Sequence, residues 1–109
     1  MSEVNQLQKQ LEDSKKLIER RRQAIRLSEN KDFKKLILEG FCLSDAASYV
    51  SASADPQLSA EQRQDALNIA QAAGHLKRFL SVVTQMGAVA ERDVGQIEEA
   101  IVAAQAEEI

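Results

Sequence analysis

The sequence lacks tryptophan and has only one cysteine, one histidine and one proline among its 109 residues. A single cysteine, Cys42, excludes an intrachain disulfide. Together with the single histidine, His75, it cannot supply the four nitrogen and sulfur ligands of a typical zinc site. Four glycines and one proline are too few turn-forming residues for an all-β fold. We therefore expect an all-α chain with no cofactor.

The sequence also lacks the residue groupings of common active sites. His75 and Cys42 are distant in the sequence, and no serine motif surrounds the histidine, so no nucleophile–base pair is indicated. There is no glycine-rich phosphate loop and no dinucleotide fingerprint. The acidic pairs at 98–99 and 107–108 join adjacent residues, which point to different faces of a helix. We expect that the protein is not an enzyme.

Long apolar runs and targeting segments are missing as well. No apolar run approaches the roughly 20 residues of a membrane-spanning helix. The N-terminal stretch Met-Ser-Glu-Val-Asn-Gln is too polar and acidic for a signal peptide. We therefore expect a soluble protein of the cytoplasm with no membrane partner.

What the sequence does contain is a long heptad pattern in its second half. Apolar or small residues recur there at alternating steps of three and four, the spacing that keeps one stripe against a partner helix. We call this stripe the seam, and it consists of Ala66, Ile69, Ala73, Leu76, Leu80, Val83, Gly87, Ala90, Val94, Ile97, Ile101 and Ala104. Ser59 and Gln62 form a capping box, so we expect segment 59–106 to be one long helix. Gly87 either permits close backbone approach or marks a kink or break, and we favour a continuous or gently bent helix.

The N-terminal segment 1–28 has a less regular pattern. Its apolar residues repeat every seven positions, at Val4, Leu11, Ile18 and Ile25. Polar residues occupy most of the intervening seam positions, at Ser14, Arg21 and Ser28. This pattern predicts an amphipathic helix from Glu3 to Ser28 with an imperfect coiled-coil seam.

Two short helices are predicted within residues 33–53. The first follows a cap at Asn30 or Asp32 and ends at Gly40 in the left-handed conformation. The second follows a cap at Ser44. An α-helical period places the large side chains of the first short helix, with the residue after Gly40, on one face: Phe33, Leu36, Ile37 and Phe41.

These elements predict a single helical domain over residues 1–109, an elongated helical hairpin or coiled coil with the two short helices near the turn. The first helix is too short to cover the whole long helix, so part of the seam is left for a partner. A second stripe, Phe79, Val82, Met86 and Val89, adjoins the seam and either contacts a partner or is covered by the short helices. The predicted self-association or partner interface is Ile69, Leu76, Phe79, Leu80, Val83, Met86, Val94, Ile97 and Ile101.

Charge is distributed unevenly although the net charge is only −3. Residues 1–35 hold ten Lys and Arg against six Asp and Glu, whereas residues 36–109 hold four against eleven. The basic face either pairs with acidic residues of another helix or contacts phosphates of a nucleic acid. The candidate nucleic-acid contacts are Lys15, Lys16, Arg20, Arg21, Arg22 and Arg26.

Three segments carry a resemblance to a known group of proteins. They are Asn-Lys-Asp-Phe-Lys-Lys-Leu-Ile-Leu-Glu-Gly-Phe at 30–41, Ala-Asp-Pro-Gln-Leu at 54–58, and Leu-Lys-Arg-Phe-Leu with Gln-Met-Gly between 76 and 87. The chain resembles small helical proteins encoded by tailed bacteriophages, a group with no settled activity. The resemblance implies a virion component or assembly factor, or a small effector of the infected host. It places the protein in the cytoplasm of the host cell or in the virion.

The sequence thus predicts a non-enzymatic helical assembly protein that contacts copies of itself or other phage structural proteins. One alternative is a nucleic-acid-associated packaging factor that uses the basic N-terminal helix. Another is an inhibitor that binds a host protein through its helical face.

Overall fold

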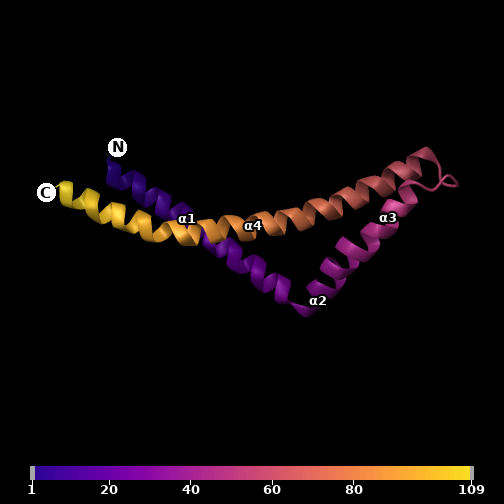
Figure 1. Cartoon of the computed structure of the whole chain (residues 1–109), viewed down its shortest axis with the longest axis horizontal. Helices are drawn as coiled ribbons and strands as arrows, with labels where there is room; N and C mark the ends of the chain where they lie inside the picture. Colours follow the sequence, from indigo (N-terminus) through magenta and orange to yellow (C-terminus); the bar gives the residue numbers. More distant parts are fainter. Residues whose placement is uncertain (1, 109) are drawn as a thin grey trace. The chain divides into compact units, whose positions relative to one another are not determined.

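Every regular element in the described part of the chain is helical. The computed structural model describes residues 2–108 (Figure 1). The elements are α1 (Glu3–Glu29), α2 (Lys31–Phe33), the π-helix η1 (Lys34–Asp45), α3 (Ala46–Ser53) and α4 (Ala60–Glu107). The predicted all-α fold with a long C-terminal helix is confirmed. Because α4 continues through Gly87, the predicted alternative of a break at that residue is wrong.

Two helix starts are capped as the sequence predicts. The Phe33 amide donates a hydrogen bond of 2.9 Å to Oδ1 of Asn30, so Asn30 rather than Asp32 caps α2. At the start of α4, the Ser59 amide donates to Oε1 of Gln62 at 2.9 Å, and the Gln62 amide donates to Oγ of Ser59 at 3.1 Å. This reciprocal capping box satisfies two amides that have no partner within the helix.

The short helices differ from the prediction because the chain does not leave the helix at Gly40. No described glycine has a positive φ, so the left-handed end at Gly40 is wrong, and so is a separate helix start capped by Ser44. The chain instead forms the wide turns of η1, in which hydrogen bonds join residues five apart. At its end, the Ala46 amide donates to the Phe41 carbonyl.

The wide turns of η1 also change which side chains share a face. An α-helical period groups Leu36 with three other large residues, yet Leu36 is 71% exposed while those three are half-buried. Leu38 and Cys42 are half-buried in its place. A π-helix has more residues per turn than an α-helix, so residues four or five apart align and Leu36 is rotated away.

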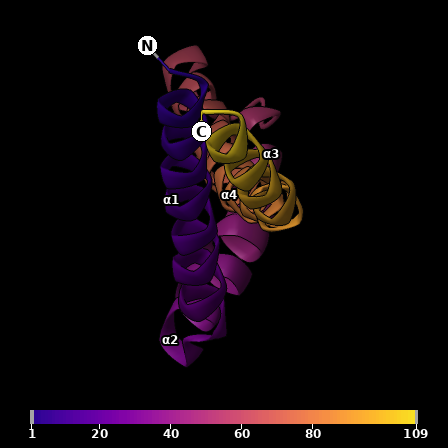
Figure 2. The same cartoon turned by 90° about the vertical axis from the view of Figure 1, so that its left-hand side faces the viewer.

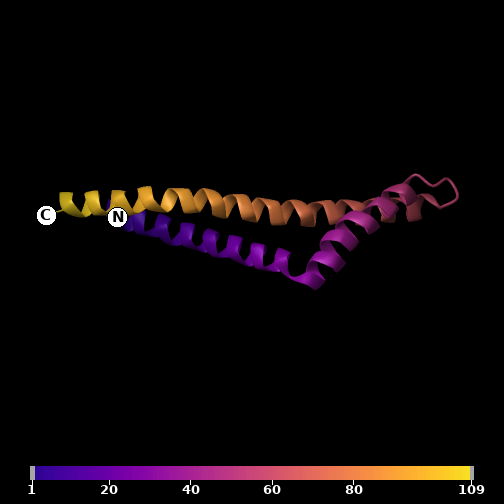
Figure 3. The same cartoon turned by 60° about the horizontal axis from the view of Figure 1, so that its bottom comes forward.

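The chain divides into two compact units, which are described separately. Unit 1 joins the chain up to Ile25 with the chain from Val82 onward. Within it, α1 and the C-terminal part of α4 lie side by side and run in opposite directions (Figures 2 and 3). The small or β-branched side chains of Ala24, Val83 and Ala90 are buried between them, which allows close helix packing.

Unit 2 is Arg26–Ser81 and contains α2, η1, α3 and the first turns of α4. Residues 54–59 connect α3 to α4 (Figure 1). The Arg63 guanidinium donates to the Leu58 carbonyl of this connection at 2.7 Å. Ala66 and Ala73 are buried, and they mark the side of α4 that the rest of unit 2 covers.

Candidate functional site

The structure places the seam of α4 mostly against the chain itself. Among the predicted interface residues, Val83 and Ile101 are buried, and Leu76, Leu80, Val94 and Ile97 are half-buried. Ile69 is the one predicted seam contact that is exposed. The seam therefore provides the packing surface within each unit and leaves little apolar area for another chain.

The second stripe of α4 remains more open to solvent. Phe79 in unit 2 is 52% exposed, and in unit 1 Met86 is 46% and Val89 is 44% exposed. Val82, which lies between Phe79 and Met86 in the sequence, is half-buried. Of the predicted interface, the stripe thus presents more large apolar surface to solvent than the seam, in which only Ile69 is exposed among the described residues.

In unit 1 this stripe borders a shallow groove between α1 and α4. Leu17 of α1 and Met86, Val89 and Ala90 of α4 form its apolar centre. Polar side chains complete its lining at Ser14, Gln85 and Asp93. We call these seven residues the interhelix groove. Leu17 lies beside the α1 seam rather than on it, and in an antiparallel pair such flanking positions of the two helices come together.

Beside this groove, the two helices approach each other closely at Gly87. A Cβ atom on Gly87 would overlap Cβ of Arg21 and lie 2.8 Å from the Leu17 carbonyl oxygen. Of the two predicted roles of Gly87, close backbone approach is therefore confirmed.

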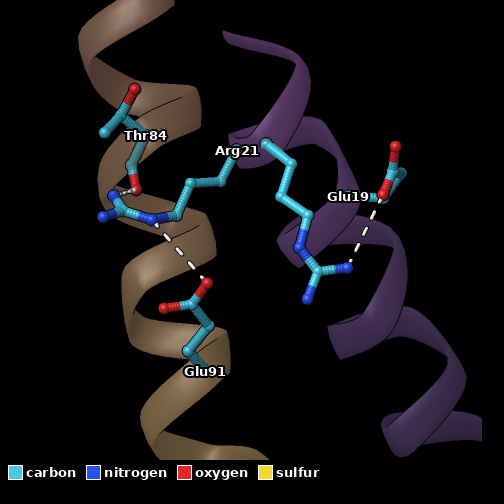
Figure 4. A network of polar contacts seen from close by, with 5 residues as sticks. Glu19, Arg21, Thr84 and Glu91 are labelled. Carbon is cyan, nitrogen blue, oxygen red and sulfur yellow. Dashed lines mark hydrogen bonds and ion pairs between the residues drawn. The ribbon is translucent and has the colours of Figure 1, made fainter. Parts of the chain in front are cut away.

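The Arg21 side chain crosses from α1 to α4 at this point (Figure 4). Its Nη1 donates a hydrogen bond of 2.9 Å to the Thr84 carbonyl, and its Nε lies 3.8 Å from Oε1 of Glu91. Arg21 is thus a packing and register residue of unit 1. Its charge groups it with the predicted basic cluster, whereas its position on the α1 seam is the sequence signal for this role.

The other candidate nucleic-acid contacts lie at the surface. Lys15, Lys16, Arg20, Arg22 and Arg26 are all exposed. Arg22 Nη1 lies 3.7 Å from Oε2 of Glu19, which points away from α4 in Figure 4. The predicted basic cluster is therefore divided, because Arg21 faces α4 while its neighbours face solvent.

Residues 2–108 form neither a candidate metal centre nor a candidate membrane-spanning helix. Within residues 2–108, no three His, Cys, Asp or Glu side chains are grouped so that they could hold a metal ion. Over the same span, no helix combines the length and apolar character that crossing a bilayer requires.

Comparison with known proteins identifies no relative. No protein-family model matches the chain, and no curated protein or solved structure does so either. The phage relationship remains a prediction from the sequence segments, and the interhelix groove is the candidate site on its geometry alone.

Proposed function

We propose that this protein is a non-enzymatic helical assembly protein that acts through helix–helix contacts. The carrying observation is that Met86 and Val89 stay nearly half exposed on a helix whose seam is already covered. Contiguous apolar surface rimmed by polar residues is typical of protein-interaction sites. Together with the sequence resemblance, this supports a virion structural or assembly component of a tailed bacteriophage.

The energetic argument concerns the apolar area that is still in contact with water. Full burial of a Met or Val side chain contributes about 1.5–3 kcal/mol, so covering the exposed half of each contributes about 1 kcal/mol. Leu17, which is half-buried, enlarges the same surface. The burial free energies of the two partners add. Association through this area is favourable when their sum exceeds the free-energy cost of the translational and rotational freedom that the two chains lose.

The test is the absolute mass in solution, measured by light scattering after size exclusion at low and moderate salt. We expect a discrete oligomer that persists at moderate salt, because apolar contacts are not screened as surface ion pairs are. A monomer at every concentration, up to roughly millimolar where weak complexes form, would refute self-assembly. An oligomer that dissociates fully when salt is raised would point instead to contacts made by charge alone.

A further inference from the structure

The interhelix groove has opposite charges at its two ends. Arg20 follows Leu17 by three residues on α1, and Asp93 follows Val89 by four residues on α4, so each lies about 5 Å along the axis from the apolar centre. Because α1 and α4 run in opposite directions within unit 1, these two steps lead to opposite ends. Both side chains are exposed.

A second carboxylate strengthens this polarity. Asp13 precedes Leu17 by four residues on α1, is exposed, and therefore lies toward the Asp93 end of the groove. Along its length, the surface thus presents a cation, an apolar centre and a pair of carboxylates.

We propose that this surface is the docking site for a second copy of the same chain, related to the first by a two-fold axis through the apolar centre. The inference rests on the proposed assembly function and specifies its partner and geometry. When the two-fold axis is perpendicular to the groove, each patch meets the same patch turned end to end. Leu17, Met86 and Val89 of both copies then share one apolar contact, and Arg20 of each copy lies opposite Asp93 of the other.

The charge order selects this orientation over the reverse one. If the second copy lay with its groove pointing the same way, Arg20 would face Arg20, and the carboxylates of Asp13 and Asp93 would face their equivalents. Like charges placed opposite each other disfavour that arrangement. The apolar centre supplies the affinity, while the charges at its ends determine the orientation.

The decisive experiment reverses the charges at the two ends in the full-length chain. Sedimentation equilibrium of the parent protein is expected to show a dimer. Arg20→Glu and Asp93→Arg, each alone, are expected to weaken dimerisation roughly five-fold or more, because each replaces a surface ion pair across the interface with two like charges. The double variant restores opposite charges across the interface, so its dimerisation is expected to return to within about two-fold of the parent.

Two matched controls separate this surface from the rest of unit 1. Glu98→Arg makes a change of the same sense as Asp93→Arg at an exposed position on the other flank of the α4 seam. It is expected to leave the dimer unchanged. Val89→Glu is expected to give a monomer with intact helix content, whereas Val102→Glu, at a 66% exposed position outside the groove, is expected to remain dimeric.

The outcomes distinguish this inference from the function on which it rests. An oligomer that is insensitive to Val89→Glu and to both charge reversals would place the contact elsewhere. That result would overturn docking at the groove but not the assembly function. A dimer that the double reversal fails to restore would overturn the end-to-end pairing. A trimer or larger ring would exclude the two-fold contact, and a monomeric parent would overturn both proposals.

Discussion

Arg21 of α1 occupies the space that the missing side chain of Gly87 leaves on α4. Both residues lie at seam positions, and the large Arg21 side chain fits there because Gly87 has no side chain. The Arg21 guanidinium donates to the Thr84 carbonyl at 2.9 Å. A polar residue held in this way at a seam position favours one register of a helix pair, so this contact fixes how α1 lies along α4 in unit 1.

Gly87→Ala is expected to destabilise the protein although alanine is the better helix former. The added methyl group would overlap Cβ of Arg21 and lie 2.8 Å from the Leu17 carbonyl. Overpacking costs about 1–3 kcal/mol. Because the overlap involves a Cβ atom and a backbone carbonyl, which cannot rotate away, we expect a cost in the upper part of this range, above the gain of about 1 kcal/mol from helix propensity. The measurement is the free energy of unfolding from urea titration followed by circular dichroism.

Gly95→Ala is the matched control on the same helix and in the same unit. Nothing lies within 4 Å of a Cβ atom built at Gly95. We therefore expect this variant to be more stable than the parent by up to about 1 kcal/mol. Stabilisation of similar size by both substitutions would show that α1 does not approach α4 at Gly87.

Arg21→Ala is expected to lower the free energy of unfolding by about 1–2 kcal/mol, because it removes a hydrogen bond from a charged donor and the packing of the arginine stem. Arg22→Ala, at an exposed neighbouring position that makes a surface pair with Glu19, is expected to change it by less than about 0.5 kcal/mol. Equal effects of the two variants would contradict the packing role of Arg21.

The ion pair of Arg21 with Glu91 is expected to contribute little. Its atoms are 3.8 Å apart and the Glu91 side chain is 47% exposed, a geometry in which surface pairs contribute roughly 0–1 kcal/mol. A double-mutant cycle of Arg21→Ala with Glu91→Gln is expected to give a coupling energy below about 0.5 kcal/mol. A coupling above about 1 kcal/mol would make the carboxylate, rather than the Thr84 carbonyl, the main partner.

Ala73→Leu tests the packing of unit 2. Ala73 is fully buried with 0% exposure, whereas its neighbour Ala72 is exposed on the same helix. Leucine and alanine have similar helix propensities, so the two substitutions differ chiefly in the space that they require. We expect Ala73→Leu to destabilise by about 1–3 kcal/mol and Ala72→Leu to be nearly neutral in urea unfolding. Comparable losses would mean that the covered side of α4 is misassigned.

The sequence predicts the α-helices well because their signals are local and regular. Caps at Asn30 and Ser59 fix two helix starts, and the heptad period identifies the seam side of α4 over residues 66–104. The heptad period does not show what covers the seam side of α4, because the same spacing is found in contacts within a chain and in contacts between chains. Arg21 is a related case, because its charge groups it with the predicted nucleic-acid contacts, whereas its seam position predicts a contact between helices.

The interhelix groove was only partly predictable. The α4 pattern identifies Met86 and Val89 as a second stripe, but the contribution of Leu17 depends on the register and direction of α1, which the sequence does not specify. The charge order along the groove follows from that register as well. From the sequence alone, Arg20 therefore groups with the basic residues of α1, and no pattern singles out Asp93.

Residues 34–45 are where the sequence pattern fails, and a pair of substitutions tests the reason. In an α-helix Leu36 and Ile37 would both lie on the packed face, but in η1 Leu36 is 71% exposed and Ile37 is half-buried. Leu36→Ser is therefore expected to change the free energy of unfolding by less than about 0.5 kcal/mol. Ile37→Ser is expected to cost about 1–2 kcal/mol, because it removes a half-buried apolar side chain. Leucine is a better helix former than isoleucine, so the change in helix propensity alone would make Leu36→Ser the more costly substitution. A larger cost at Ile37 therefore reports burial, and equal costs would show that this segment packs with the α-helical rather than the π-helical period.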